Sequence, residues 1–399
     1  MEPSGPTMKY YIISGEASGD LHGSNLIKAL HQLDTNAEIR CWGGDLMQAA
    51  GATLVKHYRD LAFMGFAEVV KNLPIIFQNI KFCKEDILRC QPDVLVLIDY
   101  PGFNLRIAEW GKENGFRIAY YISPQVWAWK ANRVKKMKKS IDRMLCILPF
   151  EKAYYKDNWN WDVTYVGHPL VEVIESKIQE PANYPHLTNT HSTNHIPISQ
   201  RSEDPAKSES PNPQLIALLP GSRKQEIAKK LPIMLEVAKS FPQEVFAVAQ
   251  APGLDDSFYT PFLAAYPNVV TVQNQTYDLL LHAKAALVTS GTATLETALF
   301  GVPEVVCYKG SSISYQIAKR LIKINFISLV NLIMDKEVVK ELIQDALTPE
   351  KLVRELDLLL HDKQRREKLK EDYAQLKQQL AAGGKASRKA AEIIIGMTR

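Results

Sequence analysis

The sequence lacks any apolar run long enough to cross a membrane as a helix, although 46% of its 399 residues are hydrophobic. Residues 1–7 also lack the charged and apolar regions of a signal peptide. The five cysteines form no Cys-x-x-Cys pair, a usage typical of buried, reduced thiols rather than a redox or metal centre. We therefore expect a cytosolic protein, long enough for two domains with a connector.

Several cofactor signatures are missing as well. No Asp-x-Asp triplet occurs, and no His or Cys cluster has the spacing of metal ligands, so the sequence predicts no metal site. Neither the P-loop pattern nor the dinucleotide G-x-G-x-x-G spacing is matched by the glycine turns described below. These absences argue against ATP hydrolysis and hydride transfer, and we expect no cofactor.

Positive charge is concentrated in one short segment. The formal net charge is only +4, yet residues 130–143 hold seven Lys or Arg and one Asp, which gives +6 there and leaves the remainder slightly acidic. This distribution indicates an anionic surface or ligand near the segment rather than a general nucleic-acid binder. A solvated helix face explains the same pattern.

Short apolar runs alternate with helical patterns along most of the chain, which predicts an α/β fold with parallel sheets. The expected strands are 10–14, 94–98, 117–122, 144–148, 163–166, 215–219, 245–249, 269–272, 286–289 and 304–308. Residues 180–214 are rich in Asn, Ser, Thr, Pro and His, which is typical of a solvated linker or insertion. Beyond Lys336 the chain is expected to be helical and charged to its end.

These patterns predict four segments. We expect a Rossmann-like domain over 8–176, a polar linker over 177–214, a second Rossmann-like domain over 215–335 and a helical segment over 336–399.

Two glycine turns in the second domain suit a nucleotide diphosphate. Ser290, Gly291 and Thr292 follow a strand and open a helix, whose N-terminal N–H groups favour phosphate. Gly221, Ser222 and Arg223 repeat this arrangement and add a guanidinium able to bind a diphosphate with two hydrogen bonds. Glu296, further along the first helix, has a carboxylate suited to both ribose hydroxyls. An ordinary capped helix is the alternative for the Ser290 turn.

Asp99 is the candidate general base. It follows the apolar strand 94–98, at the carboxyl edge where open α/β sheets bind ligands. A carboxylate in an apolar site can have the raised pKa that suits proton abstraction from an attacking sugar hydroxyl. A helix N-cap is the alternative role.

A third glycine turn lies near the N-terminus, where it follows an apolar strand and opens a helix, so the residues by themselves predict a second nucleotide-binding type of turn. Its candidate residues are Gly15, Glu16, Ser18, Gly19 and His22, joined by His168 from a later turn. Asp20 in the same turn is interpreted as a cap. Each histidine is also consistent with a structural hydrogen bond, and Asn331 has a similarly open role near the donor side.

An apolar stretch suggests a lipid-facing surface. Residues 61–82 combine many large apolar side chains with a few lysines, and Trp127 and Trp129 precede the basic segment. The residues assigned to this lipid patch are Met64, Phe66, Val69, Leu73, Ile76 and Phe77. An interfacial patch for anionic lipid and a core-packed helix with a wet lysine face both fit.

Several long motifs, taken in order, resemble the lipid A disaccharide synthases, which are inverting glycosyltransferases of the GT-B architecture. They are Ser14-Gly15-Glu16-Ala17-Ser18-Gly19-Asp20, Ile98-Asp99-Tyr100-Pro101-Gly102-Phe103-Asn104, Tyr121-Ile122-Ser123-Pro124-Gln125-Val126-Trp127-Ala128-Trp129, Leu148-Pro149-Phe150-Glu151, Val166-Gly167-His168, Leu218-Leu219-Pro220-Gly221-Ser222-Arg223 and Ser290-Gly291-Thr292-Ala293. The resemblance covers nearly the whole chain. It implies two Rossmann-like domains facing a central cleft, with C-terminal helices that cross back or are exchanged between protomers of a homodimer.

The resemblance also implies an activity. Such enzymes transfer 2,3-diacylglucosamine from UDP to the 6-hydroxyl of 2,3-diacylglucosamine 1-phosphate (lipid X), with inversion, at the cytosolic face of the inner membrane. By motif, Asp99 is similar to the catalytic base, Arg223 and residues 290–292 to the diphosphate site, Glu296 to the ribose ligand and Asn331 to a further donor-side residue. The resemblance also places the first glycine turn, with His22 and His168, on the acceptor side of the site. No metal is implied, and Arg223 with helix N-termini would stabilise the departing UDP.

This chain departs from the family pattern in two places. Some members have an acidic residue where Gly102 stands, so Asp99 is expected to act without a second carboxylate. The 180–214 segment is longer than expected. Two other functions remain: another UDP-sugar enzyme, either a peptidoglycan-type glycosyltransferase or a sugar-nucleotide epimerase, and a non-catalytic nucleotide- or lipid-binding protein.

Overall fold

The computed structural model describes residues 7–61, 73–128, 131–181, 184–188, 213–310 and 325–398. The chain forms two compact units: unit 1 comprises Met1–Glu172 with Gln379–Arg399, and unit 2 comprises Val173–Gln378. Both passages between the units lie inside helices, α8 (Pro169–Gln179) and α16 (Lys363–Ala381).

Unit 1 is built on a 7-stranded parallel sheet with the order β3-β2-β1-β4-β5-β6-β7. Its strands are β1 (Lys9–Ile13), β2 (Glu38–Gly43), β3 (Thr53–His57), β4 (Val94–Ile98), β5 (Ile118–Tyr121), β6 (Arg143–Cys146) and β7 (Thr164–Tyr165). All five residues of β4 are fully buried, because helices cover both faces of a parallel sheet.

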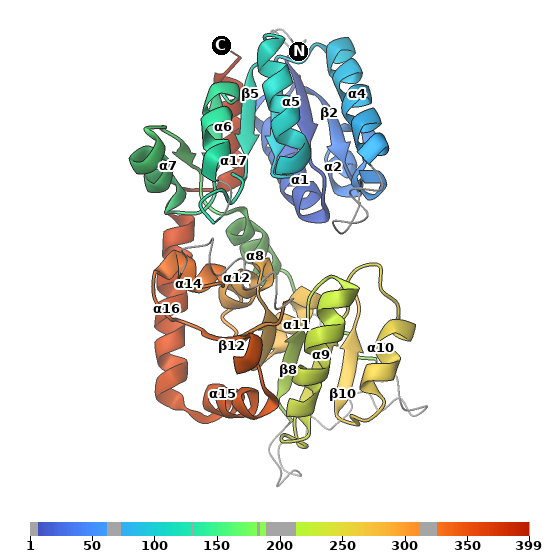
Figure 1. Ribbon diagram of the computed structural model, residues 1–399, viewed down its shortest axis with the longest axis vertical. Coiled ribbons are helices and arrows are strands. Elements are labelled where there is room, and N and C mark those ends of the chain that lie inside the picture. Colours follow the sequence, from blue (N-terminus) through green and yellow to red (C-terminus); the bar gives the residue numbers. More distant parts are fainter. Residues whose placement is uncertain are drawn as a thin grey trace. The chain divides into compact units, whose positions relative to one another are not determined.

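The helices of unit 1 are α1 (Ala17–Leu33), α2 (Asp45–Ala49), η1 (Tyr58–Leu61), α4 (Leu73–Cys90), α5 (Pro101–Glu113), η2 (Ala131–Arg133), α6 (Val134–Ser140), α7 (Glu151–Trp159) and α17 (Ala386–Gly396). They cover this sheet, with α5 and α6 side by side in front of β5 (Figure 1). Helix α1 contacts α2 and α17, whereas α5 contacts α4 and α6. The strand order reverses between β1 and β4, so the sheet has its topological switch point there.

Unit 2 repeats this architecture with a 6-stranded parallel sheet in the order β10-β9-β8-β11-β12-β13. Its strands are β8 (Leu215–Leu219), β9 (Val245–Ala249), β10 (Val269–Val272), β11 (Ala285–Thr289), β12 (Glu304–Tyr308) and β13 (Lys340–Ile343). Its remaining helices are α9 (Lys224–Ala238), α10 (Asp256–Leu263), α11 (Thr276–His282), α12 (Thr292–Leu299), α14 (Leu329–Met334), η4 (Gln344–Ala346) and α15 (Pro349–His361). Here the switch point lies between β8 and β11.

The C-terminus returns to unit 1. Helix α17 packs on α1 of the same chain, and Lys389 Nζ donates to the carbonyl oxygen of Tyr165 at 3.0 Å. The preceding turn passes so close to Gly167 that a Cβ there would lie 2.5 Å from the Gly384 carbonyl oxygen. The expected crossing back of the C-terminal helices is therefore confirmed. Gly167 is required where the returning chain passes, because any side chain there would clash with it.

Several sequence expectations are wrong in detail. The segment after Lys336 is not wholly helical, because β13 adds an edge strand that its charged residues conceal. Its last part, residues 379–399, belongs to unit 1 rather than to a separate segment. Strands β2 and β3 were also missed. Each contains polar residues that interrupt its apolar sequence, so neither appears as a continuous apolar run.

The linker also begins later than expected. Residues 177–179 continue α8, and Lys177 Nζ lies 3.0 Å from Asp278 Oδ1. Thr188 forms an antiparallel bridge with Thr271, and His186 N donates to Gln275 Oε1 at 2.8 Å, so 184–188 packs on unit 2. Residues 189–212 lie outside the described part of the chain.

A search of the described helices found none that is both long and apolar enough to cross a membrane.

Candidate active site

The donor-side residues predicted from the sequence come together at the switch point of unit 2. Gly221, Ser222 and Arg223 follow β8, while Ser290, Gly291 and Thr292 follow the neighbouring strand β11. All six line one cavity of about 390 Å³, with Glu226 and Glu296 also in its wall. Parallel strands end at the same edge of a sheet, which is why turns 67 residues apart, from 223 to 290, meet.

The backbone of both turns depends on glycine. Gly221 has a φ of 122° and Gly291, the N-cap of α12, has a φ of 147°, a region that other residues rarely adopt. The Ser290 hydroxyl donates to the carbonyl oxygen of Ile327 at 3.1 Å, which ties its turn to the loop before α14. A glycine N-cap leaves the first N–H groups of α12 at the cavity wall, as a phosphate site requires.

Glu296 also faces this cavity. The Tyr277 hydroxyl donates to its carboxylate at 2.7 Å, and burial raises the pKa of Glu296 while that hydrogen bond opposes the shift. A carboxylate held by one donor keeps further acceptor positions for a ligand hydroxyl. This arrangement supports the ribose role predicted for Glu296.

Asn331 does not take the donor-side role predicted for it. Its amide is fully buried, and its oxygen accepts from the N–H groups of Val338 and Val339 at 2.8 and 3.0 Å. Its nitrogen donates to the Val339 carbonyl oxygen and to Glu341 Oε1, both at 2.9 Å. All four hydrogen-bonding positions of the amide are therefore used within the protein.

Asn331 instead positions the donor-side loop. Glu341, which it contacts, also accepts from the N–H groups of Ile327 and Ser328 at 3.0 and 2.9 Å. Ile327 in turn holds Ser290 through its carbonyl oxygen. The sequence could not distinguish these two roles of Asn331, because an Asn in a loop has the same sequence pattern whether it contacts a ligand or holds the loop.

The candidate base lies at the corresponding switch point of unit 1. Asp99 ends β4, and Gly15 and Glu16 follow the neighbouring strand β1. Tyr100, not Asp99, occupies the N-cap of α5, so the capping alternative for Asp99 is wrong. Both Asp99 and Tyr100 are left-handed, with φ of 43° and 49°, a conformation that costs free energy in non-glycine residues.

Neighbouring side chains hold this strained turn. The Asn104 amide donates to the carbonyl oxygens of Ile98 and Asp99 at 3.1 and 2.8 Å, and the Tyr120 hydroxyl donates to the Asp99 carbonyl at 2.5 Å. Main-chain strain that is fixed in this way is typical of functional sites. These hydrogen bonds hold the main chain of the turn and do not involve the Asp99 carboxylate.

The electrostatic environment of Asp99 suits a general base. Burial raises its pKa to about 6, and the negative charge of Glu16 contributes, whereas a hydrogen bond from the Tyr100 backbone opposes the shift. Asp99 is therefore a carboxylate at pH 7 but a stronger base than an exposed aspartate. The carboxylate expected to be missing at Gly102 is not replaced at that position, but Glu16 from the β1–α1 turn lies near enough for its charge to act on Asp99.

Gly15 and Asp20 have structural reasons to be in the first turn. A Cβ on Gly15 would lie 2.4 Å from the Tyr100 ring, so only glycine allows the ring to pack there. Asp20 caps α2, accepting from the N–H groups of Gly44 at 2.8 Å and Met47 at 3.0 Å. Asp20 thus does not cap α1, the helix that its turn opens and whose N-cap is Glu16, but serves a helix that begins 25 residues further along the chain, at Asp45.

Ser18 and Gly19 differ in exposure. Ser18 is exposed, whereas Gly19 is buried with the Ser14 side chain 2.8 Å from the position of a Cβ. Gly19 thus allows close packing of α1 on β1, and Ser18 is the hydroxyl that remains available in this turn.

His22 and His168 are buried in unit 1. Burial lowers the pKa of His22 to about 4 and that of His168 to about 3, with the nearby His22 as the second cause for His168. His168 Nδ1 accepts from the N–H of Leu170 at 3.2 Å, and the backbone N–H of His168 donates to the Leu380 carbonyl oxygen at 3.1 Å. His168 therefore has a structural role beside the returning C-terminal segment.

The lipid-patch prediction lies partly outside the described residues, which exclude Met64, Phe66, Val69 and the side chain of Leu73. Within α4, Ile76 is half-buried against the core and Phe77 is 57% exposed. Trp129 is also outside the described part, and Trp127 is half-buried, donating from Nε1 to Glu151 at 3.3 Å. Trp127 is thus hydrogen-bonded within unit 1, and its place in the lipid patch stays a prediction.

Comparisons with known proteins decide the family. The family model described as lipid-A-disaccharide synthetase matches residues 10–395. The chain belongs to this family. It is 37% identical over 398 residues to the lipid-A-disaccharide synthase of Geobacter metallireducens, covering 98% of each chain. It is 36% identical over 379 residues to that of Coxiella burnetii, covering 94% of this chain and 95% of the relative. The resemblance seen in the motifs is confirmed.

Solved structures confirm the fold. UDP-GlcNAc 2-epimerase from Neisseria meningitidis, bound to UDP-GlcNAc, aligns with a TM-score of 0.64 over 98% of this chain and 99% of the epimerase. The glycotransferase of kitacinnamycin aligns with a TM-score of 0.63 over 99% and 100%. Both are only 13% identical to this chain, so they are evidence for its fold alone. That fold consists of two Rossmann-like domains of the GT-B type.

Lys230 is a donor-side residue that the sequence analysis missed. It lies on α9, is only 4% exposed, and its ammonium donates to the Thr289 hydroxyl in the wall of the donor cavity. Burial lowers its pKa, while the charge of Glu226 raises it. In sequence it is one of two adjacent lysines in a helix, and only its burial distinguishes it from Lys229.

We expect Lys230→Met to weaken UDP binding about three- to tenfold, because it removes a poorly screened positive charge behind a wall that carries two glutamates. Isothermal titration with UDP measures the change. Lys229→Met is the control, since it removes an exposed charge from the same helix. Equal affinities for the two variants would show that Lys230 serves packing alone.

We expect Glu16→Gln to lower the pKa of Asp99, because the lost negative charge is one of the two causes that raise it. Titration of the Asp99 carboxyl carbon by NMR, with Asp99→Asn to assign the resonance, measures this shift. Glu16→Asp keeps the charge and should keep most of the effect. An unchanged titration in Glu16→Gln would contradict the coupling.

Proposed function

We propose that this protein is a lipid-A-disaccharide synthase. It transfers 2,3-diacylglucosamine from UDP-2,3-diacylglucosamine to the 6-hydroxyl of 2,3-diacylglucosamine 1-phosphate, forming the β-1,6-linked disaccharide 1-phosphate and UDP. The observation that carries the proposal is the placement of the family motifs at both switch points, with Asp99 in unit 1 and Arg223 in unit 2. The family match supports the same activity.

The proposed reaction is a single displacement at C1 of the donor sugar. The 6-hydroxyl oxygen of the acceptor forms a bond to C1 as the bond from C1 to the UDP oxygen breaks, so the configuration at C1 inverts. Asp99 takes the hydroxyl proton, for which a pKa of about 6 is well matched near neutral pH. Arg223 and Lys230 stabilise the charge that develops on the departing UDP.

The binding roles follow the cavity of unit 2. The diphosphate contacts the N–H groups of the 221–223 and 290–292 turns, and Glu296 accepts from the ribose hydroxyls. Glu16 and Ser18 are assigned to the acceptor side with Asp99. His168 and Asn331 are not carried into the proposed site, because their side chains are hydrogen-bonded within the protein. His22 stays assigned to the acceptor side, since its buried Nδ1 has no hydrogen-bond partner among the described residues.

A direct assay tests the function. The purified protein is mixed in detergent micelles with both substrates, with and without EDTA, and the disaccharide and UDP are followed by mass spectrometry. We expect both products in both conditions, because the proposed mechanism uses protein groups for the leaving-group charge. UDP formation or sugar isomerisation without acceptor would favour an epimerase, and ligand binding without products would favour a non-catalytic role.

We also propose peripheral association with the cytosolic surface of the inner membrane. Helix α4 supports this, because Ile75, Phe77, Phe82 and Leu88 are 41–57% exposed on a helix whose Ile80, Cys83 and Ile87 face the core. Large exposed apolar side chains on one helix are typical of an interfacial surface. A homodimer, which the family resemblance implies, stays a prediction that analytical ultracentrifugation can test.

We expect Phe77→Asp to weaken flotation with anionic vesicles about tenfold, because a Phe side chain would no longer be buried in the interface. Leu33→Asp is the control, since Leu33 is an exposed apolar residue of unit 1 on a different helix. Equal flotation of both variants would contradict the role of α4.

A further inference from the structure

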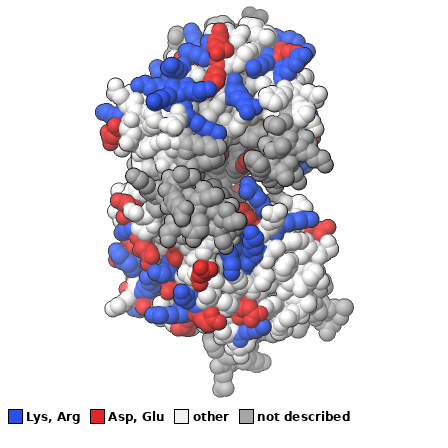
Figure 2. Space-filling model, in the orientation of Figure 1, with Lys and Arg blue, Asp and Glu red and all other residues white. Residues whose placement is uncertain are grey.

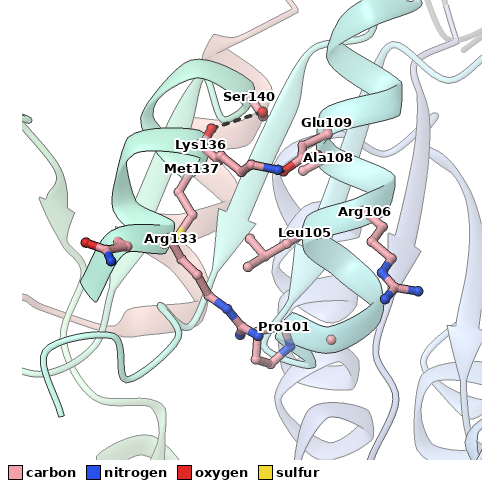
Figure 3. A pocket seen from close by; sticks show the side chains of 11 residues that line it. Pro101, Leu105, Arg106, Ala108, Glu109, Arg133, Lys136, Met137 and Ser140 are labelled. Carbon is pink, nitrogen blue, oxygen red and sulfur yellow. Dashed lines mark hydrogen bonds and ion pairs between the residues drawn. The ribbon is translucent and has the colours of Figure 1, made fainter. Parts of the chain in front are cut away.

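A groove between α5 and α6 has no role in the site described so far. It encloses about 510 Å³ and lies within unit 1 (Figure 3). Pro101 and Gly102 form one end, and Arg133 and Lys136 line the α6 side. Because two adjacent helices of one unit form it, its shape does not depend on unit 2.

The groove begins next to the candidate base. Pro101 and Gly102 follow Asp99 and Tyr100 directly, and a Cβ on Gly102 would meet no atom within 4 Å, so this end is open. Burial raises the pKa of Tyr120, whose hydroxyl donates to the Asp99 carbonyl, and the positive charge of Arg133 opposes that rise. A ligand in the groove would therefore lie beside the turn that holds Asp99.

The lining combines positive charge with apolar surface. Arg133 extends from the start of α6 toward Pro101, whereas Arg106 extends away on the other side of α5 (Figure 3). Lys136 Nζ lies 3.5 Å from Glu109 Oε1, and because Glu109 also lines the groove, it offsets part of the Lys136 charge and leaves Arg133 as the main cation on this side. Leu105 and Met137 supply the apolar surface between them. Such a lining suits an amphiphile with an anionic head.

The surrounding surface reinforces this preference. Lys and Arg side chains gather over the part of unit 1 that contains α6 (Figure 2). These are part of the segment with a net charge of +6, from seven basic residues and one acidic residue between 130 and 143. A field of this kind concentrates anionic ligands at the mouth of the groove.

We propose that the α5–α6 groove binds the acceptor, with Arg133 holding the phosphate monoester and the Leu105 and Met137 side of the groove contacting an acyl chain. This rests on the proposed function, whose acceptor is an acylated sugar carrying one phosphate monoester. The planar guanidinium of Arg133 suits bidentate binding of a phosphate, whereas Lys136, paired with Glu109, contributes less. The phosphate anchor places the rest of the sugar at the Asp99 end of the groove.

Steady-state kinetics with two acceptors test this assignment. The acceptor is varied in detergent micelles, either as 2,3-diacylglucosamine 1-phosphate or as the same sugar without phosphate. For Arg133→Ala we expect KM for the phosphorylated acceptor to rise about ten- to a hundredfold, the range for loss of a charge-assisted hydrogen bond. KM for the donor should not change, and the preference for the phosphorylated acceptor should largely disappear.

Two further variants sharpen the test. Arg133→Lys keeps the charge but not the paired donors, so its KM should lie between those of the wild type and Arg133→Ala. Lys139→Ala is the control, because Lys139 is an exposed cation of α6 that does not line the groove. Circular dichroism verifies that each variant is folded.

The outcomes separate the two proposals. If the wild type makes disaccharide and Arg133→Ala keeps both its KM and its preference for phosphate, the groove assignment is wrong and the proposed function stands. If Arg133→Ala changes only binding to anionic vesicles, the groove meets the bilayer and the assignment is again wrong. If the wild type makes no disaccharide from either acceptor, the proposed function itself fails.

Discussion

Asp99→Asn is expected to reduce kcat about 10²- to 10⁴-fold, the usual contribution of a positioned general base. Asparagine is nearly isosteric with aspartate but cannot accept the proton of the attacking hydroxyl. Because the left-handed turn is held through its backbone by Asn104 and Tyr120, the substitution should leave the fold of unit 1 intact. UDP affinity, which depends on unit 2, should remain at the wild-type value.

The pH profile provides an independent readout for Asp99. Since the pKa of Asp99 is raised to about 6, the base is protonated and inactive below that pH, and kcat/KM should rise from pH 5 to about 7 and then level. The residual activity of Asp99→Asn should lack this rise. Glu113→Gln, at the exposed far end of α5, is the matched control. Near-normal turnover of folded Asp99→Asn would remove Asp99 from the mechanism.

Arg223→Ala is expected to have the second-largest effect, with UDP affinity reduced about ten- to a hundredfold and kcat reduced as well. The Arg223 side chain lines the donor cavity and is 65% exposed. Its ion pair with Glu226, at 3.9 Å, is therefore weak, because solvent screens charges that are this exposed. A diphosphate would gain two charge-assisted hydrogen bonds from this side chain. Loss of kcat would show that the contact strengthens as UDP departs.

The design separates charge from geometry. Arg223→Lys keeps one positive charge without the planar fork and should recover part of the affinity. Lys224→Ala removes a neighbouring charge that does not line the cavity and should have little effect. Titration calorimetry measures the affinity for UDP, and initial rates at varied donor concentration measure kcat. If Arg223→Ala matched Lys224→Ala in both, Arg223 would have no role in donor binding.

Much of each sheet could be predicted because a strand buried on both faces appears as a short apolar run. The bounds of β4, β8 and β9 agree with the expectation residue for residue. Edge strands are partly exposed and carry charges, so β3 and β13 resemble loops or helix ends in sequence. The glycine turns were found because φ values such as that of Gly291 restrict the residue type.

The sequence alone determined the family, the apolar strands and the motif residues that follow them, because these depend on local pattern and residue chemistry. Tertiary structure decided which strand ends are neighbours, and so paired Asp99 with Glu16 and the 221–223 turn with 290–292. Tertiary packing also buries Asn331 within hydrogen bonds of the protein and places Lys230 behind the donor cavity. The α5–α6 groove likewise exists only because these two helices pack side by side. The physical reason is that burial and proximity arise when segments distant in sequence pack together, and no local pattern encodes that packing.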